Sequence, residues 1–87
     1  MFNFIYAPAF VRKFNKLEKD LQDEALEKIN LFKDKNNHKI LKIHKLHGRL
    51  QDRHSLYVNY KTRIIFVWEG EQKVVFLTIG DHDIYKN

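Results

Sequence analysis

Apolar and polar residues alternate through the first positions of the chain. Phe2, Phe4 and Tyr6 are separated by single residues, so the aromatic side chains repeat with the two-residue period of a β-strand. Pro8 follows closely, and its fixed φ angle suits the first turn of a helix. The pattern therefore predicts a short N-terminal strand that leads directly into a helix.

From residue 9 onward, apolar residues recur at steps of three and four with charged residues between them, which indicates a helix with one apolar face. A continuous helix over residues 9–32 would be roughly 36 Å long. A compact domain of this size has a radius of gyration of only about 12 Å. We therefore expect a helical hairpin that breaks around Lys19 to Asp23, with Asp20 and Asp23 as candidate N-caps of the second helix. The apolar positions are Phe10, Phe14, Leu17, Leu21, Ala25, Ile29 and Phe32.

The remainder of the chain has strand-like patterns. Residues 42–46 can form an edge strand, residues 55–60 alternate between apolar and polar, and residues 63–68 are β-branched and aromatic. After a Glu-Gly-Glu turn, residues 74–77 are apolar at every position, as in a strand covered on both faces. The order of elements predicts a single α+β domain over residues 1–87. It would have an N-terminal strand, a helical hairpin and a three- to four-stranded, mostly antiparallel sheet with the helices on one face.

Strand alternation divides the predicted sheet residues between two faces. Leu56, Val58 and Tyr60 share one face, and Tyr57 lies on the other. If the helices cover the Leu56 face, Tyr57 and Arg63 should lie together on the opposite, open face.

Positive charge is concentrated in the middle of the chain. Residues 39–63 contain seven Lys or Arg residues and one acidic residue, a net charge of +6, whereas the whole chain carries +5. Three of the five histidines lie in the same segment. Cations bind phosphates, and histidine exchanges protons near neutral pH. The segment therefore predicts a site that binds phosphates and moves protons, although a solvated basic surface would have the same charge.

Several classes of protein are disfavoured by composition. The chain has no cysteine, which excludes disulfides and thiolate metal sites. No apolar run approaches the roughly 20 residues of a transmembrane helix, and the N-terminus lacks the features of a signal peptide. His44 and His47 would point to opposite faces of a strand, which makes them a poor metal pair. We therefore expect a cytoplasmic protein with no membrane partner, no metal and no cofactor.

Three ordered segments resemble the RelE/ParE toxin superfamily of type II toxin–antitoxin systems. They are L-H-G at residues 46–48, Y-K-T-R-I-I-F at residues 60–66 and G-D-H-D-I-Y at residues 80–85. The resemblance covers essentially the whole chain and is nearest to the YafQ-like and RelE-like mRNA endonucleases. It implies a RelE-like fold and a toxin that enters the ribosomal A site and cuts mRNA there. A cognate antitoxin would bind this toxin, which would be a monomer when free and part of a hetero-oligomer when inhibited.

Metal-independent RNA cleavage needs a base for the 2′-hydroxyl, a fixed cation for the developing phosphorane and an acid for the leaving oxygen. By position in the resemblance, Arg63 would hold the scissile phosphate and His82 would be the general acid. His44 or His54 would be the base, and Tyr85 would stack on or orient an mRNA base. The remaining RNA contacts would be made by Lys42, Lys45, Arg49, Arg53 and Tyr57.

The resemblance does not identify the base. YafQ-like members have an Asp-aromatic pair where this chain has Lys61 and Thr62. A second YafQ-like histidine aligns with Tyr57 without a gap and with His54 after a short one.

Two other functions are compatible with the sequence. A ParE-like toxin would inhibit DNA gyrase and would have no need of His82 beside Arg63. A non-catalytic RNA-binding module would bind in a salt-dependent way that survives substitution of His82 and His54. For any toxin of this class, Phe10, Phe14 and the second helix are candidates for an apolar antitoxin groove.

Overall fold

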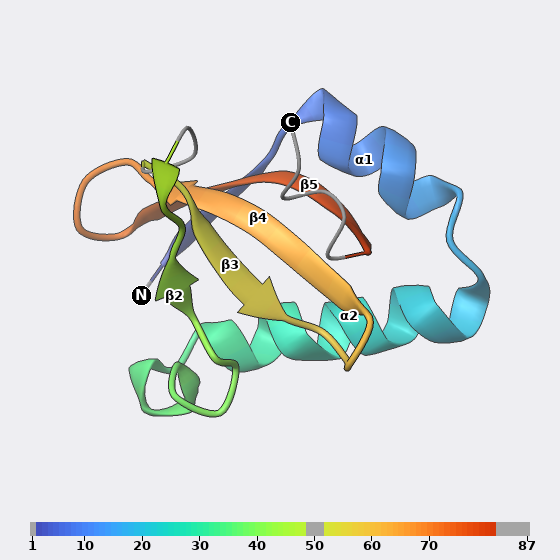
Figure 1. The fold of residues 1–87 in the computed structure, drawn as a ribbon, viewed down its shortest axis with the longest axis horizontal. Coiled ribbons are helices and arrows are strands. Elements are labelled where there is room, and N and C mark those ends of the chain that lie inside the picture. The colour runs from blue at the N-terminus through green and yellow to red at the C-terminus, as the bar shows by residue number, and fades with distance from the viewer. Residues whose placement is uncertain (1, 49–51, 82–87) are drawn as a thin grey trace.

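The computed structural model describes residues 2–48 and 52–81 and confirms the α+β class (Figure 1). A strand, two helices and a short 3₁₀ helix are followed by four further strands. The elements are β1 (Asn3–Tyr6), α1 (Pro8–Asn15), α2 (Lys19–Phe32), η1 (Lys35–Asn37), β2 (His44–Lys45), β3 (His54–Tyr57), β4 (Thr62–Trp68) and β5 (Lys73–Asp81).

All five strands belong to one sheet, in the order β1-β5-β4-β3-β2. The pairs β5–β4, β4–β3 and β3–β2 are antiparallel, whereas β1 runs parallel to β5. The mostly antiparallel sheet is therefore confirmed, with the N-terminal strand as one edge and the predicted strand near residue 44 as the other. Figure 1 shows α1 beside β5 and α2 passing across β3 and β4.

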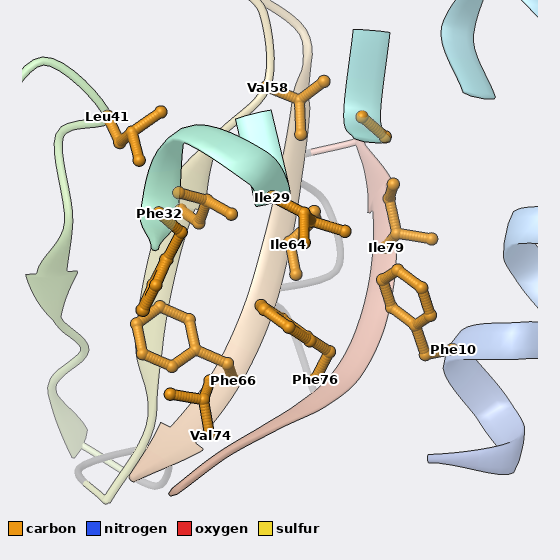
Figure 2. Close-up of a cluster of buried hydrophobic side chains, with 12 residues drawn as sticks. Phe10, Ile29, Phe32, Leu41, Val58, Ile64, Phe66, Val74, Phe76 and Ile79 are labelled. Carbon is orange, nitrogen blue, oxygen red and sulfur yellow. The ribbon is translucent and has the colours of Figure 1, made fainter. Parts of the chain in front are cut away.

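The core lies between the helices and one face of this sheet. Figure 2 shows Ile29 and Phe32 pointing from α2 toward Ile64 and Phe66 of β4. Phe32 is fully buried, and its ring meets Phe66 edge to face, with centroids 5.2 Å apart. Such aromatic pairs contribute about 0.5–1.5 kcal/mol beyond the burial of their area. This packing fixes β4, the strand that begins with Thr62 and Arg63.

The break between the helices falls earlier than the sequence predicts. α1 ends at Asn15 and α2 begins at Lys19, so the connection is residues 16–18. The N-cap of α2 is Glu18, with no side-chain capping bond, and the predicted caps Asp20 and Asp23 are wrong. Leu17 packs against the core from the connection itself, which continues the helical spacing of apolar residues through the break.

Two predictions about buried faces are also wrong. Tyr60 is 81% exposed instead of covered by a helix, because β3 ends at Tyr57 and the chain then turns. Residues 74–77 are not covered equally on both faces: Val74 and Phe76 are buried, whereas Val75 and Leu77 are only partly buried. The physical reason is that both helices pack on one side of the sheet.

Candidate functional site

Tyr57 and Arg63 are directly opposite each other on β3 and β4. Their strand neighbours Leu56 and Ile64 are fully buried in the helix-side core, so Tyr57 and Arg63 belong to the other face of the sheet. The carbon at the centre of the Arg63 guanidinium lies 4.8 Å from the centroid of the Tyr57 ring. The predicted juxtaposition of these two residues is therefore confirmed.

A second cation contacts the same tyrosine. The Lys42 ammonium lies 4.7 Å from the Tyr57 ring centroid. Arg63 comes from β4 and Lys42 from the segment before β2, so the cations approach from the two sides of β3. Each such contact at a partly exposed site contributes about 0.5–1 kcal/mol. We use the name Tyr57 cluster for Lys42, Tyr57, Arg63 and a fourth residue, His44, whose position is described below.

The guanidinium of Arg63 is held by the backbone as well as by the ring. Its Nη1 donates to the carbonyl oxygen of Asn59 and to that of Thr62, the latter at 3.0 Å. Opposite Arg63 on β5 is Gly80, which has no side chain. Within residues 2–48 and 52–81, no carboxylate lies within 4.0 Å of this guanidinium. An arginine has five N–H donors, so donors remain for an anion such as a phosphate.

His44 lies on the same face of the sheet. It pairs with Ser55, which shares a face with Tyr57. Its Nδ1 is 2.9 Å from the carbonyl oxygen of Lys42. A carbonyl can only accept, so Nδ1 carries the hydrogen and Nε2 has a free lone pair when the ring is neutral. Lys42 has a φ of 53°, rare for a residue other than glycine, and it contacts the cluster twice, by its carbonyl with His44 and by its ammonium with Tyr57.

This face is less open than the sequence predicts. Ser55 and Ile65, which pair with each other, are 0% and 2% exposed. Ser55 also pairs with His44, so larger residues flank its short side chain on both sides. Tyr57 and Arg63 are partly buried, and exposed positions begin at the sheet margin with Lys42 and His44. A substrate would therefore meet the cluster at this margin of the sheet.

His54 lies on the opposite side of the sheet from Arg63. Its ring stacks on Phe66 with centroids 5.5 Å apart and meets Trp68 edge to face. Its Nδ1 is buried and has no hydrogen-bond partner among the described residues, and burial lowers the pKa of this imidazole, with smaller contributions from Lys45 and His44. This corrects the placement expected for His54, because strand alternation separates its side chain from Arg63.

Two of the other predicted site residues, Lys45 and Arg53, belong to the described part of the chain. Lys45 pairs with His54 and therefore shares its face. Arg53 lies 3.9 Å from the Asp52 carboxylate in a half-exposed ion pair. Three further predicted residues, Arg49, His82 and Tyr85, lie outside the described residues.

Two residues absent from the sequence-based site belong to it structurally. Asn59 accepts a hydrogen bond from Arg63, and Gly80 lies opposite that arginine. The sequence pattern placed Asn59 in the predicted strand over residues 55–60 and Gly80 at the end of the last strand. Only the pairing of β3 with β4 and of β4 with β5 brings them to Arg63.

Metal binding, membrane insertion and antitoxin binding make different demands on the described part of the chain. It contains no group of three or more His, Cys, Asp or Glu side chains placed to hold a metal ion. None of its helices is both long enough and apolar enough to cross a membrane. The candidates for an antitoxin groove are only partly available, because Phe10 is buried in the core and Phe14 is partly buried. The exposed large hydrophobic residues of α1 and α2 are Val11 and Leu26.

Comparison with known proteins gives structural relatives only. No protein-family profile and no curated protein sequence matches the chain. Among solved structures, YafQ from E. coli strain BL21(DE3) is 12% identical, with a TM-score of 0.80 over 100% of both chains. The E. coli DinJ–YafQ toxin–antitoxin complex gives 15% identity and a TM-score of 0.73 over 99% of this chain and 98% of that chain. The RelBE2 toxin–antitoxin complex of Mycobacterium tuberculosis gives 16% identity and a TM-score of 0.71 over 92% of this chain and 96% of that chain. The chain therefore has the RelE-like fold of these toxins, as the sequence resemblance implied.

Proposed function

We propose that this chain is the toxin of a type II toxin–antitoxin system and an endoribonuclease that cuts mRNA in the ribosomal A site. The observation that carries the proposal is the fixed Arg63 guanidinium, held by Tyr57 and two backbone carbonyls with no carboxylate partner in the described part of the chain. A cation fixed in this way is suited to a phosphate whose charge grows during reaction. The RelE-like fold supports the same function.

In the proposed reaction, Nε2 of His44 removes the proton of an mRNA 2′-hydroxyl. The 2′-oxygen forms a bond to the adjacent phosphorus, and the bond from phosphorus to the 5′-oxygen breaks. The products are a 2′,3′-cyclic phosphate and a 5′-hydroxyl. Arg63 stabilises the phosphorane by charge-assisted hydrogen bonds, and His82 remains the proposed acid that protonates the 5′-oxygen. Each step uses side chains of the protein without a metal ion.

The structure leads us to change the proposed roles of two residues. His54 is left out of the reaction, because its ring stacks against Phe66 on the helix side of the sheet. Tyr57 is assigned to orienting Lys42 and Arg63 instead of stacking on RNA, because both cations lie against its ring. Lys42 would then bind a flanking phosphate.

A cognate antitoxin is the proposed protein partner, and mRNA on the ribosome in the cytoplasm is the proposed substrate. Two of the similar structures are toxin–antitoxin complexes. The chain carries a net charge of +5, so an acidic segment of an antitoxin would complement it.

The test is primer extension on a reporter mRNA in a translating extract that contains the purified protein. The wild-type chain should give A-site cleavage, and Arg63→Ala should lower the cleavage rate by about 10²- to 10³-fold. Arg12→Ala, on the exposed surface of α1, is the matched control and should cleave normally. Full cleavage by Arg63→Ala would remove the proposed mechanism. Growth arrest with a DNA-damage response and intact mRNA would instead indicate a gyrase inhibitor.

A further inference from the structure

Asn59 connects α2, the turn between β3 and β4, and the Arg63 guanidinium. Its side-chain oxygen accepts hydrogen bonds from the backbone N–H groups of Lys61 and Thr62, at 2.9 and 2.7 Å. Its side-chain nitrogen donates to the carboxylate of Glu24 on α2, at 2.9 Å. Its backbone carbonyl accepts from Arg63. One residue thus joins elements that are 35 positions apart in the chain.

Both carbonyls that hold Arg63 belong to this turn, which we call the Asn59 turn (residues 58–62). The Thr62 carbonyl also accepts from the backbone N–H groups of Val58 and Asn59, at 3.1 and 3.3 Å. The Asn59 side chain closes the same turn from the other direction by binding the N–H groups of Lys61 and Thr62. The conformation of the turn therefore sets where the two acceptors of Arg63 lie.

The side-chain chemistry of asparagine matches these contacts. The amide oxygen accepts from the two backbone N–H groups, while the amide nitrogen donates to Glu24. Aspartate would keep the acceptor but lose the donor, and it would place a carboxylate against that of Glu24. Alanine would lose both interactions and leave the two N–H groups without their partner.

We propose that Asn59 is a positioning residue for Arg63 and that Glu24 anchors it to α2. The bonds within the Asn59 turn hold the two carbonyls in place, and the carbonyls hold the guanidinium at the site of the scissile phosphate. The role at the phosphate rests on the proposed function, whereas the effect on the guanidinium does not. Misplacement of a reacting group by about 1 Å can cost on the order of 10²-fold in rate.

The main experiment is a double-mutant cycle with Asn59→Ala and Arg63→Ala, measured as single-turnover cleavage well below the unfolding temperature. Asn59→Ala alone should lower the rate by about 10- to 100-fold. In the Arg63→Ala background the same substitution should change the rate by less than about 2-fold, because the group that it positions is absent. A loss of equal size in both backgrounds would overturn the inference.

Asn37→Ala is the matched control for lost stability. The Asn37 amide is partly buried and donates to the Leu31 carbonyl at 2.9 Å, so its removal also deletes a bond from a side chain to the backbone. That variant should be destabilised but should cleave at the wild-type rate per folded molecule. An equal rate loss in Asn37→Ala and Asn59→Ala would reduce Asn59 to a general structural role and overturn the inference.

Exchanging the amide of Asn59 and the carboxylate of Glu24 tests the contact between these two side chains. Asn59→Asp should lower the cleavage rate by about 10-fold, since two carboxylates would then face each other. Adding Glu24→Gln gives the pair a donor again and should restore at least half of the wild-type rate. Glu27→Gln, on an exposed position of the same helix, should give no rescue. Equal recovery with Glu27→Gln, or none with Glu24→Gln, would contradict the anchoring role.

A readout without RNA separates this inference from the proposed function. In NMR spectra of the free protein, the Arg63 guanidinium protons should give signals protected from exchange, and Asn59→Ala should remove that protection while Asn37→Ala should not. If the wild-type chain cleaves no mRNA but this loss occurs, the proposed function fails and the positioning of Arg63 stands. If protection is unchanged in Asn59→Ala, the positioning inference fails whatever the protein cleaves.

Discussion

His44 and His54 lie on neighbouring strands of the same sheet but in opposite surroundings. The ring of His44 is exposed, and its Nδ1 is engaged by a backbone carbonyl, so Nε2 is available. The ring of His54 stacks on Phe66, and its Nδ1 is buried with no hydrogen-bond partner in the part of the chain that the structure describes. The difference arises because His44 pairs with Ser55, so His54 is one position out of register and faces the other way. One face of this sheet therefore serves packing, and the other presents polar groups.

The largest effect on the packed face is expected from Phe32→Ala. Phe32 is fully buried and contacts several aromatic rings, so its loss should lower the free energy of unfolding by about 3–5 kcal/mol. Urea unfolding measures this change, with Leu26→Ala on the exposed side of α2 as the control. An unchanged unfolding midpoint would mean that the aromatic core does not support the sheet in this way.

On the polar face, His44→Gln should reduce mRNA cleavage by about 10²-fold, because it removes the proposed base. His54→Gln is the matched substitution on the packed face and should keep the cleavage rate of the folded protein within about 3-fold of wild type. Single-turnover rates of the two variants compare the faces directly. The reverse order of effects would exchange the two histidines in the mechanism.

A smaller effect is expected from Tyr57→Leu. This substitution keeps apolar bulk but removes the ring that Lys42 and Arg63 contact. Losing about 0.5–1 kcal/mol of cation–π interaction corresponds to a decrease of about 2- to 5-fold in cleavage rate. Tyr57→Phe retains the ring and should cleave at nearly the wild-type rate. A similar loss in both variants would assign the role to the hydroxyl group instead.

The smallest effect concerns stability at acidic pH. Burial lowers the pKa of His54 in the folded protein, so the unfolded chain binds a proton more readily. The contribution of His54 should therefore lower the free energy of unfolding as the pH falls from the ordinary histidine pKa of about 6.5 toward the lowered pKa. In His54→Phe this part of the decline should be absent between pH 7 and 5, as measured by unfolding midpoints. If the unfolding midpoints of the wild-type and His54→Phe proteins changed with pH in the same way, this expectation would be contradicted.

Sequence patterns predicted the parts of the fold that depend on local alternation. Leu56 and Tyr57 were assigned to opposite faces, and this is correct because strand period alone determines the relation between neighbouring residues. The helix break was misplaced because Leu17 continues the apolar spacing from outside both helices. Local pattern does not distinguish a helical residue from a connecting residue that packs on the same core.

The remaining features of the site depend on contacts between distant segments. The shared face of Tyr57 and Arg63 depends on the pairing of β3 with β4, and the exposed ring of Tyr60 depends on the point at which β3 ends. The link from Glu24 to Asn59 spans 35 residues and has no sequence pattern. Residue types alone therefore indicated the chemistry, whereas strand register determined which of those residues can act together.

The parallel pairing of β1 with β5 has a consequence for biosynthesis. During translation, β1 has no neighbour in the described sheet until β5, the last described strand, has been made, since β5 separates β1 from β4. β5 also supplies Gly80 beside Arg63. A nascent chain that stops before residue 73 therefore has neither a complete sheet nor a finished surface around Arg63, which delays any activity of this protein until β5 has been made.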